Sequence, residues 1–279
     1  MEKGLEAIRQ RLSVRSYAEQ QLEPEVRRQL EELCLNHKDA GPFGAAVRFR
    51  LLDLEPLSSS DLRKMGTYGV IKGARLYIMG AVRNEAGAME DLGYCLENII
   101  LEATALGFGT CWLGGTFKRS AFAGKMELAE DELLPAITPV GYPAVEKSTT
   151  ERVMRFGAGS NRRKPWSELF FKSDGVTALT EPESGPFKEA YEAVRMGPSA
   201  SNKQPWRLVL DQQGATHLYL KENKLYNRMM GKVRLQLVDM GIAMSHFEVA
   251  ARELNLPGAW HTETDGPPIA GLQHIACWK

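Results

Sequence analysis

The 279-residue chain has no excess of either charge, no closely spaced pair of cysteines and no histidine pair at metal-binding spacing. Lysine plus arginine and aspartate plus glutamate number 35 each, which disfavours general binding to nucleic acid. The four cysteines include no C-x-x-C pair, so the sequence predicts neither a disulfide framework nor a zinc site. The five histidines show no H-x-x-x-H or H-E-x-x-H spacing, which disfavours any other metal centre.

Long apolar runs are also missing. No stretch approaches the roughly 18 uncharged residues that span a bilayer, and charges interrupt every short apolar run near Met1. We therefore expect a cytoplasmic protein with no membrane segment. Its composition, 43% apolar and 25% charged, is typical of a globular fold with one large or two modest domains.

Helices and strands are predicted to alternate along the chain. Apolar residues at helical spacing predict helices over 3–12, from Pro24 onward, and over 86–106, 165–171, 187–195 and 229–254. Short apolar runs predict strands over 47–52, 76–82, 110–113, 136–140, 207–210 and 217–220, with two more near the end of the chain. We expect an α+β fold, although this pattern alone also allows α/β.

The second half of the sequence echoes the first. An offset of 148 residues pairs Asp91-Leu-Gly93 with Asp239-Met-Gly241 and Trp112 with Trp260. This likeness predicts an internal duplication with two half-domains, residues 1–172 (the first half) and 173–279 (the second half). Two amphipathic helices that resemble each other by chance are the alternative.

Three motifs offer groups for binding a ligand. Arg11, Ser13 and Arg15 alternate, so in an extended segment they share one surface while Leu12 and Val14 face the core. Two guanidinium groups beside a hydroxyl suit a phosphate, because arginine binds oxyanions through paired hydrogen bonds. The same pattern also fits a solvated polar face.

The other two motifs are loops. In the Pro198–Trp206 loop, two prolines bracket serine, asparagine and glutamine, which can present donors and acceptors to a planar heterocycle. An ordinary turn before a strand is the alternative. Glycines at 107–115 would allow backbone N–H groups to approach a ligand closely, or would simply bracket a buried strand.

Taken in this order, the motifs resemble those of the FMN-dependent nitroreductase family. The likeness includes the Arg-x-Ser-x-Arg start, the Pro-Ser-x-x-Asn-x-Gln-Pro-Trp loop, Val140–Pro143 and the basic segment Arg163–Pro165. Ordinary members carry all of these motifs in one subunit and build each flavin site across a homodimer. Here the loop lies only in the second half and the Arg-x-Ser-x-Arg motif only in the first. The resemblance therefore implies a fused pseudo-dimer, expected to be monomeric, in which one site survives and its symmetry mate has decayed.

The resemblance also assigns roles to individual residues. It places the FMN phosphate on Arg11, Ser13 and Arg163, and Arg15 near the N1/O2 edge of the flavin. Backbone N–H groups of Gly114 and Gly115 would face N5 and O4. The loop residues are expected to contact the ring and ribityl chain, with Gln204 supporting them; these residues are Pro198, Ser199, Ala200, Ser201 and Asn202.

The implied activity is an oxidoreductase that works by a ping-pong mechanism. NADH or NADPH would reduce FMN, and an electron-poor small molecule such as a nitroaromatic or quinone would then be reduced in the same place. Because the flavin performs the chemistry, no catalytic side chain is predicted. The alternatives are a flavin-dependent dehalogenase or oxidase on the same fold, and an FMN-binding protein without turnover.

Overall fold

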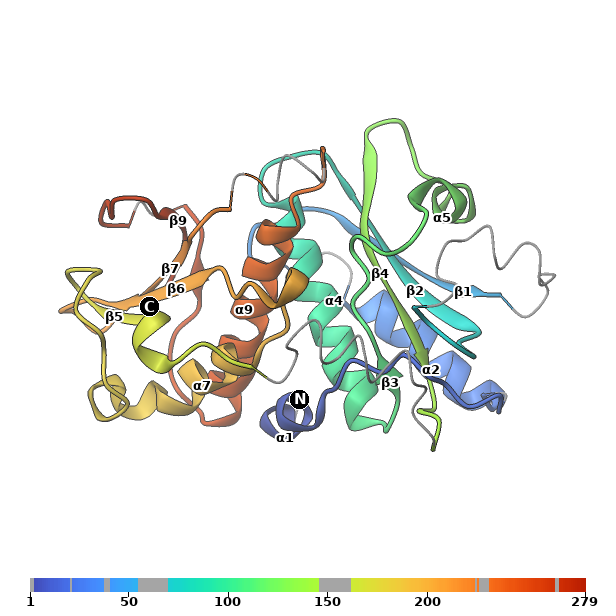
Figure 1. Cartoon of the computed structure of the whole chain (residues 1–279), viewed down its shortest axis with the longest axis horizontal. Helices are drawn as coiled ribbons and strands as arrows, with labels where there is room; N and C mark the ends of the chain where they lie inside the picture. Colours follow the sequence, from blue (N-terminus) through green and yellow to red (C-terminus); the bar gives the residue numbers. More distant parts are fainter. Residues whose placement is uncertain are drawn as a thin grey trace.

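Two sheets and the helices between them form the protein, shown here as a computed structural model (Figure 1). It describes residues 3–20, 22–37, 41–54, 70–145, 162–223, 225, 231–263 and 266–279. Most of the predicted connection over 144–164 lies outside these ranges. None of the helices in the described ranges combines the length and the apolar character that crossing a bilayer requires.

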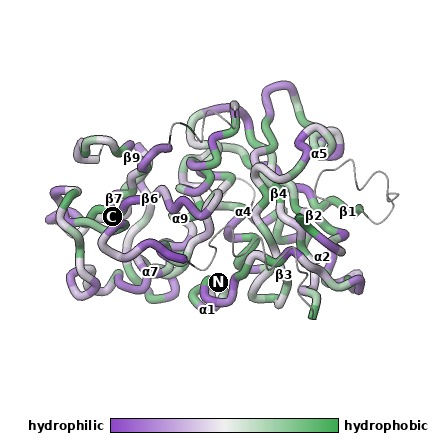
Figure 2. Tube along the Cα trace, viewed as in Figure 1, coloured by the Kyte–Doolittle hydropathy of each residue, from purple (hydrophilic) through white to green (hydrophobic). Residues whose placement is uncertain are grey.

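The first sheet is antiparallel and four-stranded, in the order β1-β2-β4-β3. Its elements follow the chain as α1 (Gly4–Gln10), α2 (Pro24–Asn36), β1 (Val47–Asp53), β2 (Leu76–Arg83), α4 (Ala88–Ala105), β3 (Gly109–Thr110), α5 (Arg119–Met126) and β4 (Glu132–Gly141). Strands β2 and β4 and helix α4 consist mostly of hydrophobic residues (Figure 2). They are buried because they form the centre of this half.

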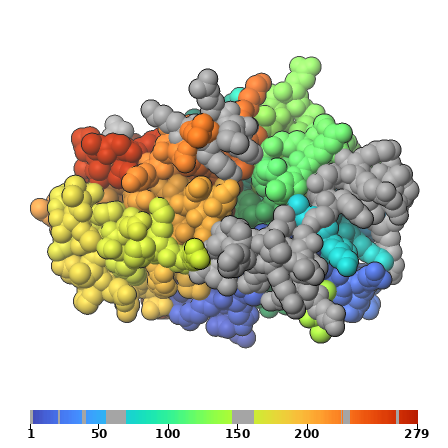
Figure 3. All heavy atoms as spheres, in the orientation of Figure 1, coloured from blue at the N-terminus to red at the C-terminus, as the bar shows by residue number. Residues whose placement is uncertain are grey.

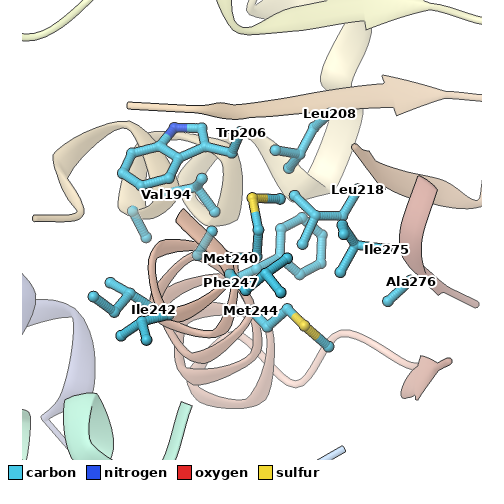
Figure 4. Close-up of a cluster of buried hydrophobic side chains, with 14 of the residues drawn as sticks. Val194, Trp206, Leu208, Leu218, Met240, Ile242, Met244, Phe247, Ile275 and Ala276 are labelled. Carbon is cyan, nitrogen blue, oxygen red and sulfur yellow. The ribbon is translucent and has the colours of Figure 1, made fainter. Parts of the chain in front are cut away.

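The second sheet has five strands in the order β5-β6-β7-β9-β8. Its elements are β5 (Phe170–Lys172), α7 (Lys188–Met196), β6 (Trp206–Leu210), β7 (Thr216–Leu220), α9 (Leu235–Glu253), β8 (Trp260–His261) and β9 (Gln273–Trp278), with three short 3-10 helices, η1 (Trp166–Glu168), η2 (Pro182–Phe187) and η3 (Ala200–Asn202). Met240, Met244 and Phe247 point from α9 towards this sheet and fill the space between helix and strands (Figure 4).

The two sheets repeat one topology, as the duplication predicts. The order β6-β7-β9-β8 matches β1-β2-β4-β3, and α7 and α9 occupy the places along the chain that α2 and α4 hold in the first half. Strand β5 comes from the first half but pairs in parallel with β6, so the first half extends one strand into the second sheet. Figure 3 shows the two halves side by side, the second in yellow to red and most of the first in green and cyan.

Helices α4 and α9 cross at two glycines that the duplication pairs. A Cβ atom on Gly241 would lie 1.8 Å from the Glu90 carbonyl oxygen, and one on Gly93 would lie 2.1 Å from that of Val238. The backbones therefore touch at this crossing, where no larger residue fits. This close crossing joins the two halves and sets their relative position.

Several predicted elements differ from the observed ones. The predicted helix over 165–171 is a single 3-10 turn, η1, followed by strand β5. The strand forms because Phe170 packs among buried residues of α7, α9 and the second sheet, and because the Leu169 carbonyl accepts a hydrogen bond from the Leu208 N–H at 2.9 Å. The helix predicted from 229 begins at Leu235, although residues 229 and 230 lie outside the described ranges. Helix α5 was not predicted.

Candidate functional site

A cavity of about 340 Å³ lies where the two halves meet. Its walls come from the segment after α1, the segment after β3, Arg163, the loop before β6 and one side of α9. Eleven of the twelve predicted site residues line it: Arg11, Ser13, Arg15, Gly114, Gly115, Arg163, Pro198, Ser199, Ala200, Ser201 and Asn202. The twelfth, Gln204, lies behind the loop and is buried.

The segment after α1 is extended and held to the end of β3. Ser13 forms a parallel bridge with Thr110, and the Val14 N–H donates to the Thr110 carbonyl at 2.8 Å. Alternation then directs Arg11, Ser13 and Arg15 to the cavity, as predicted. The prediction that Leu12 faces the core is wrong, because Leu12 is 48% exposed, whereas Val14 packs against the core of the first half as predicted.

Three guanidinium groups give the cavity its positive charge. Burial, and then the nearby Arg11 and Arg195, lower the pKa of Arg163 to about 10. Within the described residues, Arg11 Nε and Arg15 Nη1 are buried without a hydrogen-bond partner. Arg11 Nε lies 3.7 Å from Glu97 Oε1, beyond hydrogen-bond distance. Guanidinium groups that lie close together and lack hydrogen-bond partners favour the binding of an anion.

The loop before β6 is held in an unusual conformation. Ser201, Asn202 and Gln204 have φ values of 51°, 52° and 48°, in the left-handed region that few non-glycine residues adopt. Asn202 lines the cavity, but its side chain bridges to the neighbouring segment, since Oδ1 accepts from Arg163 at 3.2 Å. Strain of this kind at a cavity is a frequent feature of ligand sites.

Gln204 supports this loop, as the sequence suggested. Its Oε1 accepts the Lys164 N–H at 2.8 Å, and its Nε2 donates to the carbonyl oxygens of Asn202 and Arg162 at 3.3 and 3.4 Å. It thereby ties the loop to the segment that carries Arg163. The side chain is only 3% exposed, so water cannot replace these bonds.

We expect Gln204→Leu to lower the free energy of unfolding by about 2 kcal/mol, because the part-buried Lys164 N–H loses its acceptor and the buried amide of Gln204 loses its hydrogen bonds. Urea denaturation measures this change. Gln212→Leu is the matched control, since Gln212 is exposed in the turn after β6 and its loss should change stability by less than about 0.5 kcal/mol. Equal stability of the two variants would contradict the supporting role of Gln204.

Arg119 holds the backbone at Gly114 and Gly115, which line the cavity. Its guanidinium donates to the carbonyl oxygens of Gly114, Leu134 and Pro135. In a trans peptide the carbonyl and the following N–H point in opposite directions. The Gly115 N–H therefore points away from Arg119. A Cβ on Gly114 would lie 2.8 Å from the Leu235 side chain, so glycine lets α9 pack closely here.

A buried polar network lies behind Arg11. Glu97 on α4 is fully buried, and its two oxygens lie 2.8 Å from His246 Nε2 on α9 and 2.6 Å from Trp112 Nε1. His246 Nδ1 donates to the Ala193 carbonyl at 2.8 Å. The network connects both halves to Trp112, which lines the cavity, and so stabilises the wall on which Arg11 lies.

At the position that the duplication relates to the cavity, the first-half loop lies against α4. Asp91 there accepts the N–H groups of Phe43 and Ala45 at 2.9 and 2.8 Å. The Phe43 side chain packs against Gly87, where a Cβ would lie only 2.6 Å from it. The first-half loop thus closes on its own helix and leaves its side chains in packing contacts.

Comparison with known proteins shows the family of the chain. A family model described as "Putative TM nitroreductase" matches residues 4–251. The chain belongs to this nitroreductase family. A search of curated proteins found no match.

One solved structure shares the fold over nearly the whole chain. A crystal structure described as a "putative nitroreductase" from Thermotoga maritima has a TM-score of 0.62 and 22% identity, and the match covers 99% of this chain and 92% of that one. A nitroreductase with bound FMN from Desulfitobacterium hafniense has 17% identity and a TM-score of 0.42, covering 53% of this chain and 92% of that one.

Sequence reasoning missed two functional features of this nitroreductase-family protein. Asp239 lines the cavity from α9, and Arg119 holds the glycine pair. An acid among the apolar residues near the start of a helix is a detectable signal for Asp239, because a carboxyl is rarely buried without a partner. Nothing in the sequence around Arg119 indicates its carbonyl partners, which come from two different segments.

Proposed function

We propose that the chain binds one FMN in this cavity and uses it to reduce a small electron-poor acceptor, such as a nitroaromatic or a quinone, at the expense of NADH or NADPH. The observation that carries the proposal is the convergence of Arg11, Arg15 and Arg163 on one cavity in a member of the nitroreductase family. The residues fit an organic phosphate, since buried guanidinium atoms there lack hydrogen-bond partners within the described residues.

Each wall would hold a different part of the cofactor. Arg11, Ser13 and Arg163 would bind the phosphate, and Arg15 would place a fixed positive charge near the N1/O2 edge. The backbone N–H groups of Gly114 and Gly115 would face N5 and O4. Pro198, Ser199, Ala200, Ser201 and Asn202 would cover the ring and ribityl chain from the second half.

Bound FMN supplies hydride transfer through N5, and the surrounding residues bind, orient and tune it. The positive charge of Arg15 would stabilise the anionic reduced flavin. A ping-pong order follows if nicotinamide and acceptor occupy the same place in turn. The proposed active form is a monomer, because one chain supplies both sides of the cavity.

Purified protein is expected to contain, or to take up, about one FMN per chain. Visible absorbance, followed by identification of the flavin released on denaturation, measures this stoichiometry. One FMN supports the single composite site, because Asp91 at the related position already has both of its oxygens bonded to its own loop. Two FMN per chain would contradict that site, and a protein that neither contains nor takes up FMN would overturn the proposed function.

Turnover separates an enzyme from a flavin-binding protein. With FMN bound, we expect NADH or NADPH oxidation that depends on an added quinone or nitroaromatic, with parallel-line kinetics when both substrates are varied. Bound flavin that neither nicotinamide reduces would overturn the enzymatic part of the proposal and leave FMN binding intact.

A further inference from the structure

Asp239 lines the cavity and has one carboxyl oxygen without a hydrogen-bond partner within the described residues. Its side chain is 2% exposed, and Oδ1 accepts the Ala200 N–H at 2.8 Å. Within the described residues, Oδ2 is buried and has no hydrogen-bond partner. Because buried polar atoms are nearly always paired, an unpaired oxygen on a residue that lines a cavity indicates a partner supplied by a ligand.

The duplication provides an internal comparison. Asp91 occupies the corresponding position on α4, and both of its oxygens accept backbone N–H groups, from Phe43 and Ala45. Asp239 keeps one such bond and lacks the other. The same residue at corresponding positions is therefore fully paired where the loop closes on its helix, and only half paired where it lines a cavity.

The loop conformation explains the missing bond. In the second half the Asn202 N–H donates to the Ser199 carbonyl at 2.9 Å. This N–H is therefore used within the loop and does not bond to Asp239. The left-handed residues Ser201 and Asn202 produce this turn of the loop. The loop residues line the cavity, and among the described residues the Ala200 N–H is the one backbone donor that Asp239 receives, where Asp91 receives two.

Burial has the largest effect on the ionisation of Asp239. Burial raises its pKa to about 8, and the Ala200 N–H opposes this rise. The other ionisable groups on the walls and on the elements packed against α9 are Arg11, Arg15, Arg163, Glu90, Asp91, Glu97, Glu189, Glu192 and Arg195, with Arg234 and His246 on α9 itself. Since Oδ1 is already an acceptor, a proton on this carboxyl resides on Oδ2 and makes it a donor.

We propose that neutral Asp239 donates a hydrogen bond from Oδ2 to an acceptor atom of FMN, so that FMN binding is linked to one proton on this residue. This inference rests on the proposed function, because it requires FMN in the cavity. Ionisation of Asp239 would remove the donor and place a negative charge beside the bound flavin. Binding should therefore weaken as pH rises.

The test is titration of cofactor-free protein with FMN at several pH values, followed by flavin fluorescence. With a carboxyl pKa of about 8, we expect the Kd to be about tenfold higher at pH 9 than at pH 7. The FMN phosphate, with a second pKa of about 6, is already ionised over this range. Asp239→Asn keeps the oxygen for Ala200 and places an amide donor at Oδ2, so its Kd should not change with pH.

Asp91→Asn is the matched control. It alters the corresponding carboxyl away from the cavity, so the wild-type pH dependence of the Kd should persist even if stability falls. Calorimetry of the unmodified protein in buffers of different ionisation enthalpy gives a second readout that does not depend on any variant folding. FMN binding should take up nearly one proton per chain at pH 9 and almost none at pH 7.

The outcomes separate the two proposals. FMN binding with no proton uptake at pH 9, or an Asp239→Asn variant that folds and keeps the wild-type pH dependence, would overturn the role of Asp239 and leave the proposed function standing. Failure of FMN to bind at any pH would overturn the proposed function, and this inference with it.

Discussion

Arg15→Met is expected to weaken FMN binding by about tenfold to a hundredfold while leaving the stability of the protein unchanged or slightly higher. A hydrogen bond to a charged group contributes about 1.5–3 kcal/mol, which corresponds to this range. Stability should not fall, because Nη1 of Arg15 is buried and finds no hydrogen-bond partner in the described part of the chain. Fluorescence titration with FMN and urea denaturation measure the two quantities separately.

Arg9→Met is the control for this prediction. Arg9 lies at the end of α1, half exposed, and pairs with Glu189 at 2.9 Å outside the cavity. Its removal should change the Kd for FMN by less than about twofold, because exposed ion pairs contribute little and salt screens them. If Arg15→Met bound FMN as tightly as Arg9→Met, Arg15 would not contact the cofactor.

The same substitution should make the bound flavin harder to reduce. A fixed positive charge stabilises the anionic reduced form more than the neutral oxidised form. The midpoint potential of bound FMN should therefore shift to a more negative value in Arg15→Met, while Arg15→Lys should retain part of the wild-type value. An unchanged potential in Arg15→Met would place Arg15 away from the flavin ring.

Gly241→Ala should lower the free energy of unfolding by about 3 kcal/mol or more. Its new Cβ would lie 1.8 Å from the Glu90 carbonyl oxygen and 2.6 Å from the Tyr94 backbone nitrogen. Backbone atoms cannot rotate away as a side chain does, so α4 and α9 would have to separate. Because the cavity lies between the two halves, FMN binding should weaken as well.

Gly124→Ala is the matched control for this substitution. Gly124 lies in α5, and a Cβ there would meet nothing within 4 Å. Alanine in an open helical position raises stability by about 0.5–1 kcal/mol. Chemical denaturation of both variants compares the effects directly, and a Gly241→Ala variant as stable as the wild type would show that the helices do not touch at this crossing.

Local sequence patterns predicted most elements where local and tertiary preferences agree. Helix α4 and strands β2 and β7 follow from their apolar patterns and their glycine boundaries. Strand β5 did not, because three residues carry no periodicity and only the open edge of β6 makes them a strand. Helix α5 was missed because it is short and has a weakly apolar face.

The candidate site, like the fold, was predicted from the sequence only in part. The sequence alone determined the chemistry of the motifs: alternating arginines, a proline-bracketed polar loop and a glycine pair. It also indicated that each motif occurs once although the fold occurs twice, which predicts one composite site.

Only the tertiary structure decided which groups have partners. Asp91 and Asp239 are the same residue at corresponding positions, yet within the described residues Asp91 has loop N–H partners for both oxygens and Asp239 for only one. Hydrogen-bond satisfaction depends on the path of a loop that lies far away in the sequence. Likewise, Arg119 reaches the Gly114 carbonyl only because α5 packs beside it. Sequence therefore determined which groups are available, and the packing of α4 against α9 decided where they meet.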